Sequence, residues 1–178
     1  MFIDVCFPDK NEASFIEIAK KLGTDGLCFV YPDKRSCDVS SSLKIYNASS
    51  KNGKYLFSSN LNLNQKNVIY YYEPQSEKKS FHSPLKEITQ VTMNSIAERS
   101  GIFGISFHQI LRIGNFEEIA FTIKLARKAN VPIFIASFGR TPYSMRDCKT
   151  LRSIINLICS HSDIIVNSTN VLDQFLSK

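Results

Sequence analysis

The sequence predicts an α/β fold of the TIM-barrel type, in which parallel strands alternate with helices. Short apolar segments of strand length alternate along the chain with segments whose apolar residues recur at helical spacing. The segment 26–31, Gly-Leu-Cys-Phe-Val-Tyr, is apolar almost throughout, which is typical of a parallel strand covered on both faces. No glycine-rich nucleotide-binding motif is present to favour an open sheet over a barrel.

The first part of the chain has the pattern of a β-α-β unit. Residues 2–7 form the first predicted strand, and residues 11–22 follow as a helix that Gly23 ends. The strand at 26–31 completes the unit. The buried face of the helix is expected to carry Phe15, Ile18, Ala19 and Leu22.

The stretch from 34 to 80 is polar and contains only short strand-like pieces. A complete eightfold barrel usually needs about 200 residues or more, and this chain has 178. We therefore predict an abbreviated barrel, with helices reduced or lost between residues 34 and 80. Strand character in and beside this stretch is confined to 55–58, 61–63, 68–72 and 79–82.

The second half continues the alternation. A helix is predicted over 83–99, with Pro84 in the first turn, where its missing N–H is harmless. Asn115 begins another helix, because acidic residues follow in its first turn and basic residues in its last turns, as the helix dipole favours. Ser144 and Asp147 resemble a capping box for a helix that runs to about Ile158. The remaining predicted elements are strands at 104–107, 131–136 and 163–166 and a helix at 169–176.

Composition limits the class of protein. With 43% hydrophobic residues and a net charge of +6, the chain is expected to form one domain over residues 1–178. No run of about 18 uncharged apolar residues predicts a membrane span, and the acidic residue at position 4 argues against a signal peptide. Five cysteines without a C-x-x-C pair suit a reducing compartment, so we expect a cytoplasmic protein.

Candidate catalytic residues are few. His108 follows the strand 104–107, at the end where barrel enzymes carry their catalytic groups, and Asp4 and Ser137 could converge with it. The interpretation we favour is that Asp4 and Ser137 satisfy buried backbone groups while His108 lies at the surface. Metal-dependent hydrolysis needs three or four ligands, and strand-end carboxylates are scarce. We therefore predict no catalytic residue and no bound metal or cofactor.

Positive charge is concentrated in one segment. Between Lys124 and Arg152 there are seven basic residues and one acidic residue. Arg140 is expected beside the start of the next helix, whose free N–H groups favour a phosphate, and Tyr143 and Phe138 are near enough for stacking. This pattern fits an RNA backbone, although a solvated basic face explains it equally well. The predicted RNA-binding residues are Lys34, Arg35, Arg112, Arg140, Arg146, Lys149 and Arg152.

The order of several short motifs resembles a known family. The opening Phe-Ile-Asp-Val-Cys, the strand 26–31, and then Phe81-His82-Ser83-Pro84, 104–107 and 131–137 follow one another as in archaeal ribonuclease P protein component 3, which has eukaryotic relatives in nuclear ribonuclease P. The resemblance covers about 1–31 and 81–160, and the chain departs from the family between 34 and 80.

The resemblance implies a non-catalytic protein with a TIM-barrel-like fold. Such a protein assists a catalytic RNA in removing the 5′ leader of precursor tRNA, with magnesium bound by the RNA. Its expected partners are ribonuclease P RNA, ribonuclease P protein component 2 and other ribonuclease P proteins, and, indirectly, precursor tRNA; no membrane partner is expected. Arg112, Arg140 and Arg146 are the best-supported RNA contacts on this basis, with Lys149 and Arg152 behind them.

Two other functions remain open at this point. A barrel enzyme resembling a phosphoester hydrolase could act on a phosphorylated small molecule, with His108 as general base and the basic residues as the phosphate site. An assembly module could instead dock a partner protein on the run Tyr70-Tyr71-Tyr72, because tyrosine is favoured at interfaces.

Overall fold

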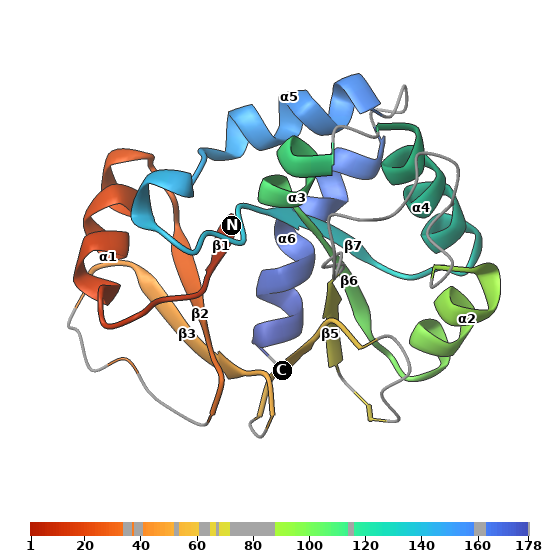
Figure 1. The fold of residues 1–178 in the computed structure, drawn as a ribbon, viewed down its shortest axis with the longest axis horizontal. Helices are drawn as coiled ribbons and strands as arrows, with labels where there is room; N and C mark the ends of the chain where they lie inside the picture. The colour runs from red at the N-terminus through yellow and green to blue at the C-terminus, as the bar shows by residue number, and fades with distance from the viewer. Residues whose placement is uncertain are drawn as a thin grey trace.

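The computed structural model describes residues 1–33, 37, 41–51, 54–60, 65, 66, 68–71, 88–113, 116–158 and 163–177. In these residues seven strands form one sheet whose spatial order is the order of the chain. Every neighbouring pair is parallel. The strands curve around a common interior, with helices outside them (Figure 1). The predicted α/β fold of the TIM-barrel type is confirmed.

The strands are β1 (Ile3–Cys6), β2 (Gly26–Tyr31), β3 (Lys44–Ser49), β4 (Leu56–Ser58), β5 (Val68–Tyr71), β6 (Ile102–Ser106) and β7 (Ile133–Ala136). The helices are α1 (Glu12–Lys21), α2 (Gln90–Glu98), α3 (Phe107–Ile113), α4 (Phe116–Lys128), α5 (Cys148–Ile158) and α6 (Asp163–Leu176), with a 3-10 turn, η1 (Pro142–Ser144). The described part of 34–80 contains strands and no helix, as the abbreviated barrel predicts. No described helix is long and apolar enough to cross a membrane.

The first and last strands meet at their carboxyl ends. Cys6 and Gly139 form an isolated parallel bridge. The N–H of Phe7 donates to the carbonyl of Gly139 at 2.8 Å, and the N–H of Gly139 donates to the carbonyl of Val5 at 3.1 Å. These bonds close the sheet at the end of a parallel barrel where functional loops gather.

Alternation along the strands divides the core into an inner and an outer part. Ile3 and Val5 of β1 point inward and pack with inward residues of the other strands, including Phe134 of β7. Outward residues of β2, such as Phe29, pack under α1. Those of β5 to β7 pack under α2, α4 and α5. Strands β1, β2 and β5 to β7 are therefore covered on both faces, which explains their continuous apolar runs in the sequence.

Helix α6 covers the amino-terminal end of the barrel. It packs on β7 and β1 and lies at the centre of Figure 1. Its Asp173 forms an ion pair of 2.9 Å with Lys44 at the start of β3, and Asn170 accepts a 2.6 Å hydrogen bond from the amino group of Met1. Three of its side chains join the inner core: Leu172, Phe175 and Leu176.

Three elements differ from the sequence prediction. Residues 163–166 begin α6 and do not form a strand. β-Branched residues favour strands, but here they open a longer helix that packs on the barrel end. The sequence did not indicate β3, because its first four residues are exposed or half-buried and read as polar loop. It also missed α3, whose buried Phe107 and Ile110 lie one turn apart.

The starts of two helices also differ from their predicted positions. Asp147, not Ser144, caps α5: its Oδ1 accepts the N–H groups of Lys149 at 2.9 Å and Thr150 at 3.0 Å. Thr89 caps α2 by accepting the N–H of Thr92, so the described helix begins well after the predicted start. The predicted strands at 61–63 and 79–82, and the predicted helix start at 83–87, lie outside the described residues.

We predict that Gly104→Ala lowers the free energy of unfolding by about 1–3 kcal/mol, as overpacking does. A Cβ at Gly104 would lie 2.6 Å from Cζ of Phe134 and 2.7 Å from Cζ of Phe138 inside the barrel. Urea denaturation measures the change. Adding Phe134→Leu should recover part of the loss, because it removes ring atoms that crowd the new methyl group; strictly additive effects would contradict this packing.

Candidate functional site

A buried carboxylate joins β1 to the segment after β7. Oδ1 of Asp4 accepts the N–H of Ser137 at 2.6 Å and that of Val5 at 2.9 Å. The hydroxyl of Ser137 in turn accepts the N–H of Arg146 at 2.8 Å. Asp4 and Ser137 are both completely buried. The interpretation that these two residues satisfy buried backbone groups is confirmed.

Burial dominates the ionisation of Asp4. Desolvation raises the pKa of its carboxyl from 3.8 to about 6, although hydrogen bonds from Ser137 and Val5 act in the opposite direction. Its Oδ2 is buried and has no hydrogen-bond partner among the described residues. His108 is exposed on α3, just after β6, while Asp4 and Ser137 are fully buried and bonded to each other. The structure therefore does not form the catalytic trio that could have converged here.

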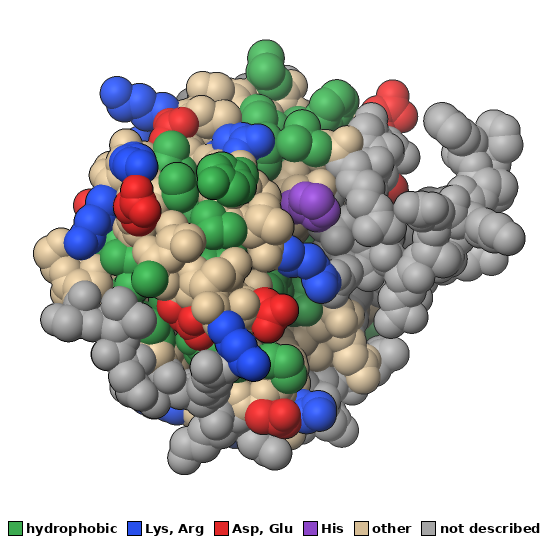
Figure 2. Space-filling view, turned by 60° about the vertical axis from the view of Figure 1, so that its left-hand side comes forward, with side chains coloured by type: hydrophobic (Ala, Val, Ile, Leu, Met, Phe, Trp, Pro, Cys, Tyr) green, Lys and Arg blue, Asp and Glu red, His purple; other side chains and the backbone are tan. Residues whose placement is uncertain are grey.

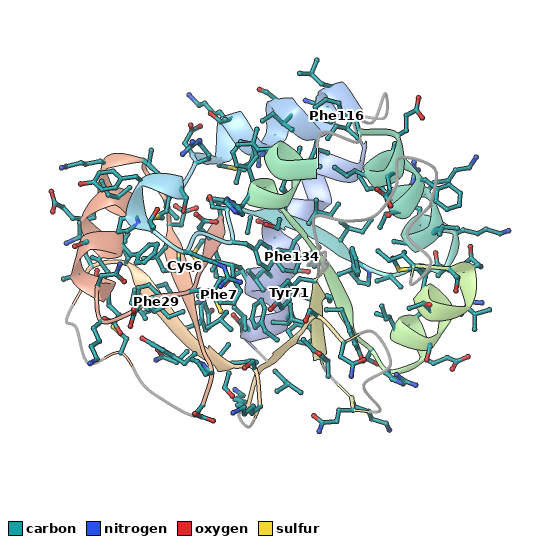
Figure 3. The ribbon with its side chains drawn as sticks, in the orientation of Figure 1. Cys6, Phe7, Phe29, Tyr71, Phe116 and Phe134 are labelled. Atoms are coloured by element: carbon teal, nitrogen blue, oxygen red, sulfur yellow. The ribbon has the colours of Figure 1, made fainter. Side chains whose placement is uncertain are left out.

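Aromatic rings fill the carboxyl end of the barrel. Phe7, Tyr71 and Phe134 come together in the middle of the ring of strands (Figure 3). Phe138 lies among them, 5.4 Å from Tyr71 and 5.9 Å from Phe134 between ring centroids. Phe57 adds a ring 6.5 Å from Phe138. These side chains occupy the place where barrel enzymes bind substrate.

Two guanidinium groups lie over rings at this same end. Arg140 is 5.6 Å from the centroid of Phe7, which follows β1. Arg146 is 5.6 Å from the centroid of Phe107, which follows β6. Nη1 of Arg146 also donates to the carbonyls of Tyr143 at 2.9 Å and Met145 at 2.6 Å. The guanidinium of Arg146 thus stabilises the turn that precedes it in the chain. Arg140 is the more exposed of the two arginines.

The basic segment 124–152 is divided between the two ends of the barrel. Lys124, Arg127 and Lys128 are exposed in the second half of α4, which leads to the amino-terminal end of β7. Arg140 to Arg152 follow the carboxyl end of that strand. Arg146 precedes α5, so only Lys149 and Arg152 continue the predicted stripe on the helix. On the face in Figure 2, basic side chains alternate with acidic ones and form no continuous patch.

The sequence suggested that free N–H groups at the start of α5 could bind a phosphate, but in the structure two of these groups are already bonded. Its N–H groups at Lys149 and Thr150 already donate to Asp147. Hydrogen bonds from the Thr150 hydroxyl and backbone keep the pKa of the Asp147 carboxyl below its usual value. Any anion at this end must therefore be bound by side chains rather than by the helix terminus.

The remaining predicted residues have different outcomes. Lys34 and Arg35 lie outside the described residues, and Arg112 is placed only as a position on α3. Tyr143 is 84% exposed, whereas Phe138 is 4% exposed and cannot stack on a ligand. Tyr70 and Tyr71 are buried, so the described part of the tyrosine run does not form a docking surface. Among the described residues, no three His, Cys, Asp or Glu side chains gather as metal ligands would.

The sequence analysis missed the aromatic filling of the barrel. Phe57, Tyr71 and Phe134 were treated as ordinary strand residues, and Phe138 as a surface ring. A usable signal was present, because Phe7, Tyr71 and Phe138 stand at or just beyond the carboxyl ends of predicted strands. In a barrel these positions face one another across the opening.

We predict that the stability contributed by Asp4 falls as pH rises from about 3 to about 7, by up to about 3 kcal/mol in total. A carboxyl whose pKa is raised to about 6 in the folded state holds a proton that the unfolded chain has already lost. Stability from this group is therefore complete below the unfolded pKa and is lost through the folded one. Urea denaturation across this range measures it, and Asp4→Asn should flatten the profile; an equally steep profile in this variant would assign the effect elsewhere.

No protein-family model matches the chain, and no curated protein sequence matches it. Among solved structures, it is similar to a chain in the cryo-EM structure of archaeal ribonuclease P with mature tRNA, with a TM-score of 0.74. The similarity covers 98% of this chain and 90% of that chain, at 17% sequence identity. The chain therefore has the fold of a chain found in archaeal ribonuclease P, the assembly to which its sequence resemblance also points.

Proposed function

We propose that this chain is a non-catalytic, RNA-binding protein subunit of ribonuclease P of the archaeal type. It would assist a catalytic RNA in removing the 5′ leader of precursor tRNA. The observation that carries the proposal is the structural match over 98% of this chain to a chain of archaeal ribonuclease P. The resemblance of residues 1–31 and 81–160 to protein component 3 supports the same assembly.

The proposed partners are ribonuclease P RNA and ribonuclease P protein component 2, with precursor tRNA contacted indirectly, in the cytoplasm. The protein's contribution would be electrostatic. Arg140, Lys149 and Arg152 are exposed in the segment that follows β7 in the chain, where they would neutralise phosphates and allow folded RNA to approach. Magnesium would be bound by the RNA, and these side chains would supply only positive charge and hydrogen-bond donors.

The geometry favours this function over the barrel enzyme. A substrate at the carboxyl end would need the space that the rings of Tyr71, Phe134 and Phe138 fill. The carboxylate of Asp4 is bonded to the backbone of Ser137, and His108 is exposed apart from them. The hydrogen-bonding groups of the barrel end thus maintain the fold, while the exposed cations are on the loops around it.

Reconstitution tests the proposed function directly. We expect no cleavage of precursor tRNA by this protein alone, and stimulated 5′ cleavage when it is added to ribonuclease P RNA and component 2 in magnesium. The measurement is the rate of leader release at limiting magnesium, with and without the protein. Cleavage by the protein alone, or an unchanged rate on its addition, would contradict the proposal.

Arg140→Gln should weaken RNA binding and reduce the slope of log affinity against log salt by about 1, because one phosphate contact is lost. The matched control is Lys128→Gln, which removes the same charge from an exposed position at the opposite end of the barrel. Filter binding over a range of salt concentrations measures both slopes. Equal slopes for wild type and Arg140→Gln would remove Arg140 from the interface, and equal losses in the two variants would indicate a diffuse field.

A further inference from the structure

Tyr143 is much more exposed than the other exposed aromatic residues of the described chain. Its side chain is 84% exposed, against 53% for Phe116 and 55% for Phe121. It occupies the middle of η1, in the loop between β7 and α5 at the carboxyl end of the barrel. An amphipathic ring in this setting is available for contact with a partner.

The backbone beneath Tyr143 is held on both sides. Pro142 before it is buried, and Met145 after it packs with the core under α1. The N–H of Ser144 donates to the carbonyl of Thr141 at 3.0 Å, and the hydroxyl of Ser144 donates to the same carbonyl at 2.6 Å. These contacts fix the backbone of the turn, while the ring of its central residue projects outward. Little backbone freedom therefore remains to be lost on binding.

Several basic residues lie near the turn that carries the ring. Nη1 of Arg146 donates to the carbonyl of Tyr143 at 2.9 Å, and Arg140 and Lys149 are exposed on either side of the turn in sequence. The pKa of Lys21 at the end of α1 is raised mainly by its hydrogen bond with Glu17 and, to a smaller extent, by Tyr143. The turn that carries the ring thus packs against α1, where Lys21 pairs with Glu17, and Arg146 is bonded to its backbone.

We propose that Tyr143 stacks on an unpaired base of the RNA that binds this end of the barrel. The inference rests on the proposed function and adds the class of RNA that this site takes, a single-stranded nucleotide in a loop, bulge or end. An exposed ring flanked by cations is how proteins bind unpaired bases, because stacking accepts any base while the cations meet the adjoining phosphates. A paired base inside a helix would not offer its face.

The test uses the full chain and two RNA probes. One is a uridine-rich single strand of about 12 nucleotides with a central 2-aminopurine, and the other is a duplex of the same length. Tyr143→Ala should lower affinity for the single strand by about 5- to 100-fold and abolish the fluorescence quenching that stacking causes. Tyr143→Phe keeps the ring and should bind within about twofold of wild type.

Controls separate this site from general RNA binding. Phe121→Ala removes another exposed ring, on α4, and should leave single-strand affinity and quenching unchanged. Duplex affinity should be the same for wild type and Tyr143→Ala. Wild-type levels of single-strand binding and quenching in Tyr143→Ala would overturn the stacking site alone. Failure of the wild-type protein to bind either probe would overturn the proposed RNA binding and this site with it. If Tyr143→Ala instead weakened only association with a protein partner, the ring would belong to a protein interface.

Discussion

The hydrogen bond from the backbone of Ser137 to the carboxylate of Asp4 organises the functional end of the molecule. It fastens β1 to the segment after β7, beside the backbone pairing of Gly139 with Val5 and Phe7. The hydroxyl of Ser137 then fixes the N–H of Arg146. Burial raises the pKa of Asp4 to about 6, so the hydrogen bonds do not fully offset the cost of desolvating this charge. Burying this charge thus costs stability, the hydrogen bonds reduce that cost, and together they fix the path of the loop that carries Arg140.

The loop after β7 places an aromatic side chain inside the barrel and leaves a basic side chain exposed on the outside. Phe138 adopts a φ of 52°, which costs a non-glycine residue about 1 kcal/mol or more. That conformation accompanies a ring that stacks on Phe134 inside the barrel, while Gly139 pairs with β1 and Arg140 is exposed. Gly104 on β6 leaves the space that these rings require. Among the described residues, aromatic packing thus fills the interior at this end of the barrel, and the exposed basic side chain of Arg140 lies on the loop outside it.

The sequence predicts most of the fold because strong local patterns agree with the tertiary structure. The β1-α1-β2 unit, α4 and β7 are all found where apolar periodicity and charge placement indicate them, while the predicted cap Asn115 lies outside the described residues. Local sequence patterns do not predict the elements whose structure depends on tertiary contacts. Strand β3 pairs along its whole length with β2 yet has polar residues, and residues 163–166 join α6 despite their strand-like composition. The catalytic alternative at His108 also depended on three-dimensional convergence, which no sequence spacing could establish.

The division of the basic segment limits how the proposed RNA partner would be bound. Counted along the sequence, 124–152 offers seven cations, but the three on α4 lead to the opposite end of the barrel from the rest. Four cations follow β7 in the chain: Arg140, Arg146, Lys149 and Arg152. Each neutralised phosphate contributes about 0.7 to 0.9 to the salt slope, so this segment can account for a slope of only about 3 to 4. In the proposed complex, charge of this size would attract RNA without choosing among sequences, and Arg146 already uses one nitrogen for the turn beneath Tyr143. Discrimination would then require a group that contacts bases, which is the role proposed for Tyr143.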